Sequence, residues 1–303
     1  MSSRIETNPK DLFFQPGPAC RAYENLRDAD DLPEVRNFIE EIWTVYAPHA
    51  DPGFLNNVRT HFHQRSWEMY LWYVFHRNGL APQKVSSAGP EFFIMLEDQR
   101  FWVEAIAPQC GDTEDAVHPP GPGRLDHVPE ANILLRMTSA LDIKLRAYKT
   151  NRKKGIIHAQ DGYIIAINGW EATGNRPDGN PPWAIKAAVG IGDLVVSVDV
   201  ARKMPPHWYH QPREHVVKNG SPVGTAAFLT AEYAGVSALL YSSLDLVNAG
   251  LRVRDPLGSE MYYFHNPQAS TPLPRGPFKF GREYVANLDQ GKLTHREWHK
   301  ARP

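Results

Sequence analysis

The stretch from Gly89 to Pro108, GPEFFIMLEDQRFWVEAIAP, constrains the fold more than any other part of the chain. Two short apolar runs, about 91–96 and 101–107, flank the turn-forming residues EDQR, which is the pattern of an antiparallel β-hairpin. Each run nevertheless contains a carboxylate, Glu91 or Glu104, among Phe, Ile, Val and Trp. An unpaired charge is costly to bury, so we expect these two acids to have a partner.

The length of the turn decides whether the two acids meet. A four-residue EDQR loop, or a two-residue loop at its centre, pairs Leu96 with Phe101. In that register Glu91 lies opposite Ile106 and diagonal to Glu104, on the same face, within about 7–8 Å. An odd loop would place the acids on opposite faces. Two carboxylates this close repel unless a proton or a cation intervenes, and Mg²⁺ prefers such oxygen-rich surroundings. The alternative is that one Glu extends into solvent at a strand end while the other pairs with Arg or Lys.

Helical and strand patterns surround the hairpin. Residues 33–48 carry an apolar stripe at helical spacing, and helices are also expected over about 54–78 and 129–150. Further strands are expected at 162–170, 193–200, 235–243 and 260–264. This order predicts an α/β fold with a mixed β-sheet flanked by helices and an elaborated C-terminal half.

Composition and length favour one soluble globular domain over residues 1–303. Hydrophobic residues make up 42% and charged residues 22% of the chain, which is ordinary for such proteins. We divide it into an N-terminal helical segment (1–53), a core (54–170) and C-terminal strands with long loops (171–303). No apolar run approaches the roughly 20 residues of a membrane span, and the N-terminus lacks a secretory pattern. The chain has only two cysteines, which are expected to be reduced thiols. We therefore expect a cytoplasmic location and no membrane partner.

Two charged residues on the flanking helices are candidates to join the two acids in one site. Glu68 lies beside the apolar face of the 54–78 helix, where an ion pair with Arg65 is the simplest alternative role. Lys144 lies on the 129–150 helix, on the ridge that also carries Leu141 and Tyr148. A lone lysine in that place usually extends its ammonium into water.

Together these residues resemble the PD-(D/E)xK nuclease superfamily, which has the restriction-endonuclease-like fold. That pattern has an acid on a first helix, a Pro-Asp strand, a Glu-x-Lys strand and a second helix. The counterparts are Glu68 in RSWEMYL, Pro90 and Glu91 in GPEF, and Glu104 in WVEAIA. The match covers roughly residues 60–170.

The lysine of that motif is absent from its usual strand position, where this chain has Ile106. Some superfamily members carry this lysine on the following helix. Lys144 in KLRAY resembles that arrangement, with Tyr148 giving a Lys-x-x-x-Tyr spacing. The expected activity therefore depends on Lys144.

The resemblance implies metal-dependent phosphodiester hydrolysis. Glu91, Glu104 and the backbone carbonyl of Ala105 would hold Mg²⁺ or Mn²⁺, with Glu68 reaching the ion directly or through water. Lys144 would orient the attacking water and offset developing charge.

A nucleic-acid partner would need local cations, because the formal net charge is −1. Six basic residues near the predicted site are candidate phosphate contacts: Arg65, Arg146, Lys149, Arg152, Lys153 and Lys154. A basic helix end is also a common solvated terminus that complements the helix dipole. The histidine pairs HFH and HWYH lack a zinc-protease arrangement, which argues against zinc hydrolysis.

The sequence therefore predicts a metal-dependent nuclease acting on DNA, with a role in defence against foreign DNA and a homodimeric assembly as further expectations. The alternative is an inactive nuclease-fold module for nucleic-acid binding or protein interaction, which Ile106 favours. A third hypothesis is an α/β protein with unrelated small-molecule chemistry, should the hairpin register be wrong.

Overall fold

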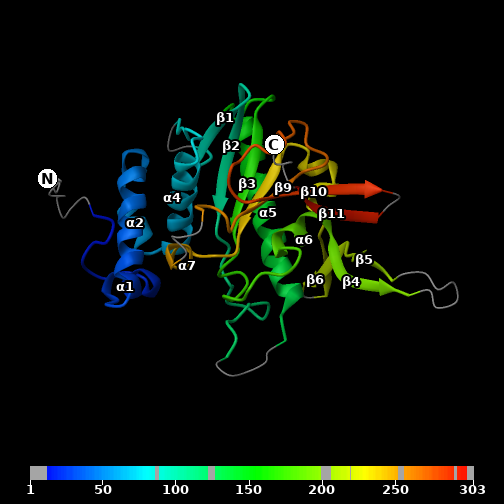
Figure 1. The fold of residues 1–303 in the computed structure, drawn as a ribbon, viewed down its shortest axis with the longest axis horizontal. Helices are drawn as coiled ribbons and strands as arrows, with labels where there is room; N and C mark the ends of the chain where they lie inside the picture. Colours follow the sequence, from blue (N-terminus) through cyan, green and yellow to red (C-terminus); the bar gives the residue numbers. More distant parts are fainter. Residues whose placement is uncertain are drawn as a thin grey trace.

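A seven-stranded mixed β-sheet runs through the centre of the protein (Figure 1). The computed structural model describes residues 12–85, 89–121, 127–198, 206–218, 220–251, 256–289 and 292–298. The strands lie in the order β1 (Phe92–Leu96), β2 (Gln99–Ile106), β3 (Gly162–Asn168), β8 (Ala238–Ser242), β9 (Tyr262–His265), β10 (Arg282–Asp289) and β11 (Lys292–Trp298). Neighbours β2, β3 and β8 are parallel, as are β9 and β10, and the remaining pairs are antiparallel.

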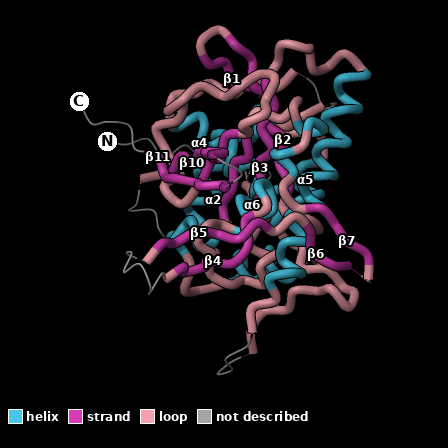
Figure 2. The backbone as a smooth tube through the Cα atoms, turned by 90° about the vertical axis from the view of Figure 1, so that its right-hand side faces the viewer, coloured by secondary structure: helices cyan, strands magenta, loops and turns pink. Residues whose placement is uncertain are grey.

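Helices cover both faces of the sheet, which confirms the predicted mixed α/β architecture (Figure 1). One face carries α2 (Pro33–Tyr46), α4 (Phe62–Arg77) and α7 (Leu246–Leu251), and α1 (Arg21–Asp28) and α3 (Phe54–Val58) contribute buried residues to the same core. The other carries α5 (Glu130–Lys153) and α6 (Trp183–Val189). Two small sheets, β4 (Ile191–Ser197) with β5 (His207–Pro212) and β6 (His215–Lys218) with β7 (Ser221–Gly224), lie on the α5 and α6 side (Figure 2).

Alternate side chains of β2 point to opposite faces of the sheet, and each set packs in a separate core. Phe101, Val103 and Ala105 pack in the core beneath α2 and α4. Trp102 packs in the core beneath α5 and α6, and Ile106 contacts the same core. Glu104 lies between these two residues at the same parity, so its side chain faces α5.

The hairpin turn is shorter and earlier than predicted. Leu96 pairs with Gln99, so the pairing of Leu96 with Phe101 was wrong, as was that of Glu91 with Ile106. Glu97 and Asp98 form a two-residue turn with φ of 48° and 64°. Left-handed backbone at both central positions matches the twist of the flanking strands, which is why this tight turn is preferred.

The observed register of the hairpin covers neither of the two acids. The last paired residues are Phe92 and Val103. Glu91 lies in the bend just before β1, outside the paired register, so its position opposite or diagonal to Glu104 is not set by strand pairing. Glu104 belongs to the α5 face of the hairpin, where it contacts Lys144.

The predicted helix over 54–78 is interrupted, giving α3 and α4. The break falls at residues 59–61, where the carbonyl of Arg59 accepts a hydrogen bond from the N–H of Cys20 at 2.6 Å. The Thr60 hydroxyl meanwhile donates to the carbonyl of Asn57. These contacts replace the helical hydrogen bonds that a continuous helix would make here, although the spacing of apolar residues alone predicts one. The helices at 33–48 and 129–150 form close to their predicted bounds.

None of the described helices has both the length and the apolar character that crossing a membrane requires. The division of the chain at residues 53 and 170 stays a prediction.

Candidate active site

Lys144 and Glu104 form the best-defined contact of the predicted site. The ammonium Nζ of Lys144 donates to Glu104 Oε1 at 2.6 Å. The contact joins the middle of α5 to β2, and the two side chains are only 14% and 9% exposed. Because the two groups are close and largely shielded from solvent, charge attraction as well as hydrogen bonding holds the pair together.

Glu104 carries an oxygen that its lysine does not use. Oε2 of Glu104 is buried and has no hydrogen-bond partner among the described residues. Burial raises the pKa of Glu104, while the Lys144 ammonium opposes this rise and the Glu68 charge adds to it. A buried carboxylate oxygen without a donor is unfavourable unless a proton or a cation reaches it.

Glu91 follows the buried Pro90 and precedes the first residue of β1. Burial raises the pKa of Glu91 well above its usual range, and the charges of Glu68 and Glu104 raise it further. The ammonium groups of Lys144 and Lys84 act in the opposite direction. The three acids therefore influence one another electrostatically.

Glu68 reaches this group from α4, which packs on the other face of the sheet. It is 3% exposed, and Arg65 donates to its Oε2 at 2.7 Å. Gln64 donates to its Oε1 at 2.8 Å. The ion pair with Arg65 that sequence reasoning named as an alternative role is thus present.

Gln64 is a site residue that the sequence analysis missed. Besides contacting Glu68, its amide group donates to the carbonyl of Ala105 in β2 at 3.3 Å and accepts from the N–H of Ala107, just after β2, at 2.7 Å. This side chain fixes the start of α4 against the end of β2. The i, i+4 spacing from Gln64 to Glu68 was the available signal.

The donor set suits a hard divalent cation in its chemistry. Glu91 and Glu104 supply carboxylate oxygens, one of them without a partner, and Ala105 supplies a carbonyl. Across the described ranges, however, no three His, Cys, Asp or Glu side chains are grouped as a ready-made metal site. A cation would thus rely on two carboxylates and on its own waters, which Mg²⁺ usually retains.

Half of the predicted phosphate contacts are engaged within the protein. Arg65 pairs with Glu68, Lys149 pairs with Glu232 at 2.6 Å, and Arg152 donates to the carbonyl of Ile157. Arg146, Lys153 and Lys154 are exposed. The basic end of α5 lies about 15 Å along the helix from Lys144, at 1.5 Å per residue.

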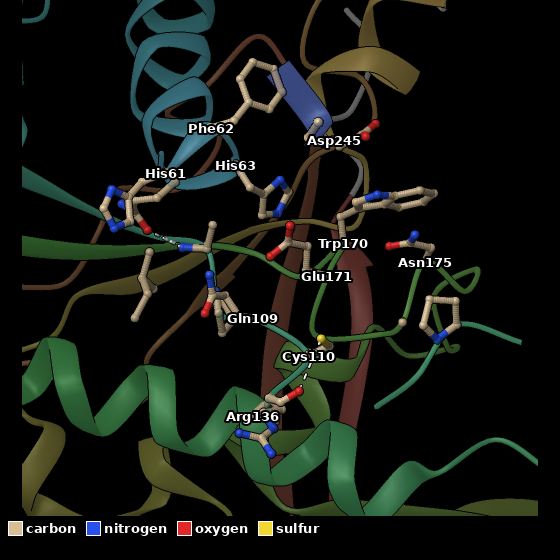
Figure 3. Close-up of a pocket in the computed structure, with 18 of the residues that line it drawn as sticks. His61, Phe62, His63, Gln109, Cys110, Arg136, Trp170, Glu171, Asn175 and Asp245 are labelled. Atoms are coloured by element: carbon tan, nitrogen blue, oxygen red, sulfur yellow. Dashed lines mark hydrogen bonds between the residues drawn. The ribbon is translucent and has the colours of Figure 1, made fainter. Parts of the chain in front are cut away.

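A cavity of about 1220 Å³ lies at the end of β2 (Figure 3). Gln64, Ile106 and Ala107 line it, whereas Glu68, Glu91, Glu104 and Lys144 do not. Ile106, at the position where the nuclease motif has lysine, therefore contributes to the cavity wall.

Comparisons with protein-family models, curated proteins and solved structures gave no match.

Proposed function

We propose that the protein is a divalent-metal-dependent nuclease with a divergent PD-(D/E)xK-type site on a restriction-endonuclease-like core. The observation that carries the proposal is the 2.6 Å contact between Lys144 and Glu104, made by a lysine on the helix after the hairpin. It supports the idea that Lys144 replaces the lysine missing at Ile106. The succession of α4, β1, β2, α5 and β3 agrees with the order of the motif.

Each side chain would have a distinct task. Glu91 and Glu104 would hold Mg²⁺ or Mn²⁺ with the carbonyl of Ala105, and the bound ion would supply Lewis-acid polarisation of a phosphoryl oxygen. Lys144 would hold the attacking water by a hydrogen bond and offset negative charge on the phosphoryl group. Glu68 would orient a metal-bound water, with Gln64 keeping its carboxylate in place.

DNA is the proposed partner, with exposed Arg146 and Lys153 on α5 and Lys154 at its C-cap as phosphate contacts. Such contacts make affinity fall steeply with salt. Replacing all three by Gln should weaken DNA binding and flatten its salt dependence.

A cleavage panel tests the function. Supercoiled and linear duplex DNA, single-stranded DNA and RNA are incubated with the protein in Mg²⁺, in Mn²⁺ and in EDTA. The proposal expects cleavage of DNA with either metal and none with EDTA. Cleavage that persists in EDTA, or no cleavage of any substrate, would contradict it.

One observation favours a second candidate, an inactive nuclease-fold module. Glu104 is only 7% exposed, and its Oε1 is already satisfied by Lys144, as in a purely structural ion pair. For this candidate the panel gives no cleavage while DNA or a protein partner is still bound.

A further inference from the structure

The cavity at the end of β2 lies where sheets of this kind commonly receive ligands. Strands β2, β3 and β8 are parallel, so their carboxyl ends meet at one edge. Chain segments just beyond all three ends line the cavity, through Ala107, Glu171 and Asp245. In open α/β sheets, ligands bind in the crevice outside the carboxyl ends of the strands. The cavity also exceeds the few hundred Å³ that enclose a small organic molecule.

The charged groups of the cavity are unbalanced toward the negative. Asp112, Glu171 and Asp245 line it, against one arginine, Arg136. That guanidinium is committed to Asp115, with Nη2 lying 2.7 Å from Oδ1. Among the described lining residues, no lysine accompanies it.

Among the described residues, no cation compensates the charges of Glu171 and Asp245. Burial raises the pKa of Glu171, and the Asp245 charge raises it further. Burial also raises the pKa of Asp245, although the backbone N–H and side-chain amide of Asn248 both donate to its Oδ1. His63 does not balance them, because burial lowers its pKa to about 4 and leaves it neutral at pH 7. His61 is exposed at the rim and bonds to Thr60.

Aromatic rings complete the wall. Trp170 and Phe62 line the cavity together with His63 and Glu171, all four of which are labelled in Figure 3. The face of an indole attracts an ammonium group and also packs against its hydrocarbon. A negative cavity with an aromatic wall favours a positively charged organic molecule and disfavours phosphate.

We propose that this cavity is a binding site for an organic cation, a small aliphatic amine whose ammonium group lies between Glu171 and Asp245 and whose hydrocarbon packs on Trp170. The site is separate from the acid cluster, since neither Glu91 nor Glu104 lines the cavity. It is also independent of nuclease activity. A nucleotide fits poorly, because its phosphate would meet three carboxylates.

Titration calorimetry with spermidine in 150 mM NaCl tests the site. Wild-type protein should bind one spermidine per chain and bind AMP more weakly. Affinity should rise with pH, because burial raises the pKa of both carboxyl groups and each must lose its proton to attract an ammonium group. Three results with wild-type protein alone would overturn the proposal. They are no binding of spermidine at one equivalent, tighter binding of AMP than of spermidine, and an affinity for spermidine that falls with pH.

Variants locate the binding. Glu171→Gln and Asp245→Asn should each weaken spermidine binding by about tenfold or more, the scale of a lost charge-assisted contact. Glu34→Gln, an exposed carboxylate in the first turn of α2, removes the same charge elsewhere and should leave affinity unchanged. Folding of each variant is checked by circular dichroism. Equal affinities of the folded Glu171→Gln variant and the Glu34→Gln control would refute the assignment.

Discussion

At the scale of single residues, the ion pair between Lys144 and Glu104 makes a stability prediction. Lys144→Met leaves the Glu104 carboxylate buried without its cation, and breaking such a pair costs roughly 3 kcal/mol or more. The pKa of Glu104 is already raised by burial and rises further without the lysine. A carboxyl group with a raised folded-state pKa loses its stabilising contribution as pH rises. The deficit of the variant should therefore be larger at pH 8 than at pH 5.

Urea unfolding of wild type and Lys144→Met at the two pH values measures this difference. Glu104→Gln/Lys144→Met should recover part of the stability, because the buried charge is gone. A deficit that does not change with pH would show that Lys144 contributes through packing alone.

Asp178 allows a second residue-scale prediction away from the site. Its Oδ1 accepts from the N–H groups of Gly179 and Trp183 at 2.9 and 3.1 Å, and burial raises its pKa from 3.8 to about 6. Protonation is thus favoured in the folded state, and its contribution to stability is present below pH 3.8 and lost as pH rises to about 6. Asp178→Asn removes this titration.

The stability of wild type relative to Asp178→Asn should therefore fall by up to about 3 kcal/mol between pH 4 and pH 7. Denaturant unfolding of both proteins across that range gives the difference directly. Parallel stability curves would mean that Asp178 titrates alike in the folded and unfolded chains.

Elements differ in how far the sequence alone determines them. Periodicity predicted α2, α5 and the hairpin strands, because each has a continuous apolar pattern. It missed the break between α3 and α4, since the hydrogen bond from Cys20 to Arg59 joins segments distant in sequence. The shared face of Glu91 and Glu104 stays a prediction, because parity applies to paired residues and Glu91 lies just before β1. Gln64 escaped notice because its contacts to β2 are tertiary.

The hairpin turn carries the element-scale prediction. Glu97 and Asp98 both have left-handed backbone, which costs an L-residue roughly 1–2 kcal/mol. Replacing them by Asn-Gly, the preferred pair for this turn, should stabilise the protein by about 1 kcal/mol. Thermal unfolding measures the gain, and Asp98→Ala serves as a control that keeps a Cβ at the second position. A double variant no more stable than wild type would argue against this turn.

At the scale of the whole molecule, the sheet places β8 beside β3 and appends β9, β10 and β11. The sequence predicted β8 and β9 as local runs but not their order, which depends on pairing between distant segments. The sequence did not predict the cavity either. The cavity lies at the edge where the carboxyl ends of β2, β3 and β8 meet, and this edge depends on how the three strands pair. The separation of cavity and acid cluster gives the molecule two sites to test independently.

Nicking of supercoiled plasmid DNA in Mg²⁺ by wild type, Glu104→Gln and Glu34→Gln tests the central claim most directly. Since the carboxylate of Glu104 would hold the metal and Lys144, its loss should slow nicking by at least about 100-fold. Glu34→Gln should cut like wild type. Undiminished nicking by folded Glu104→Gln would contradict the account.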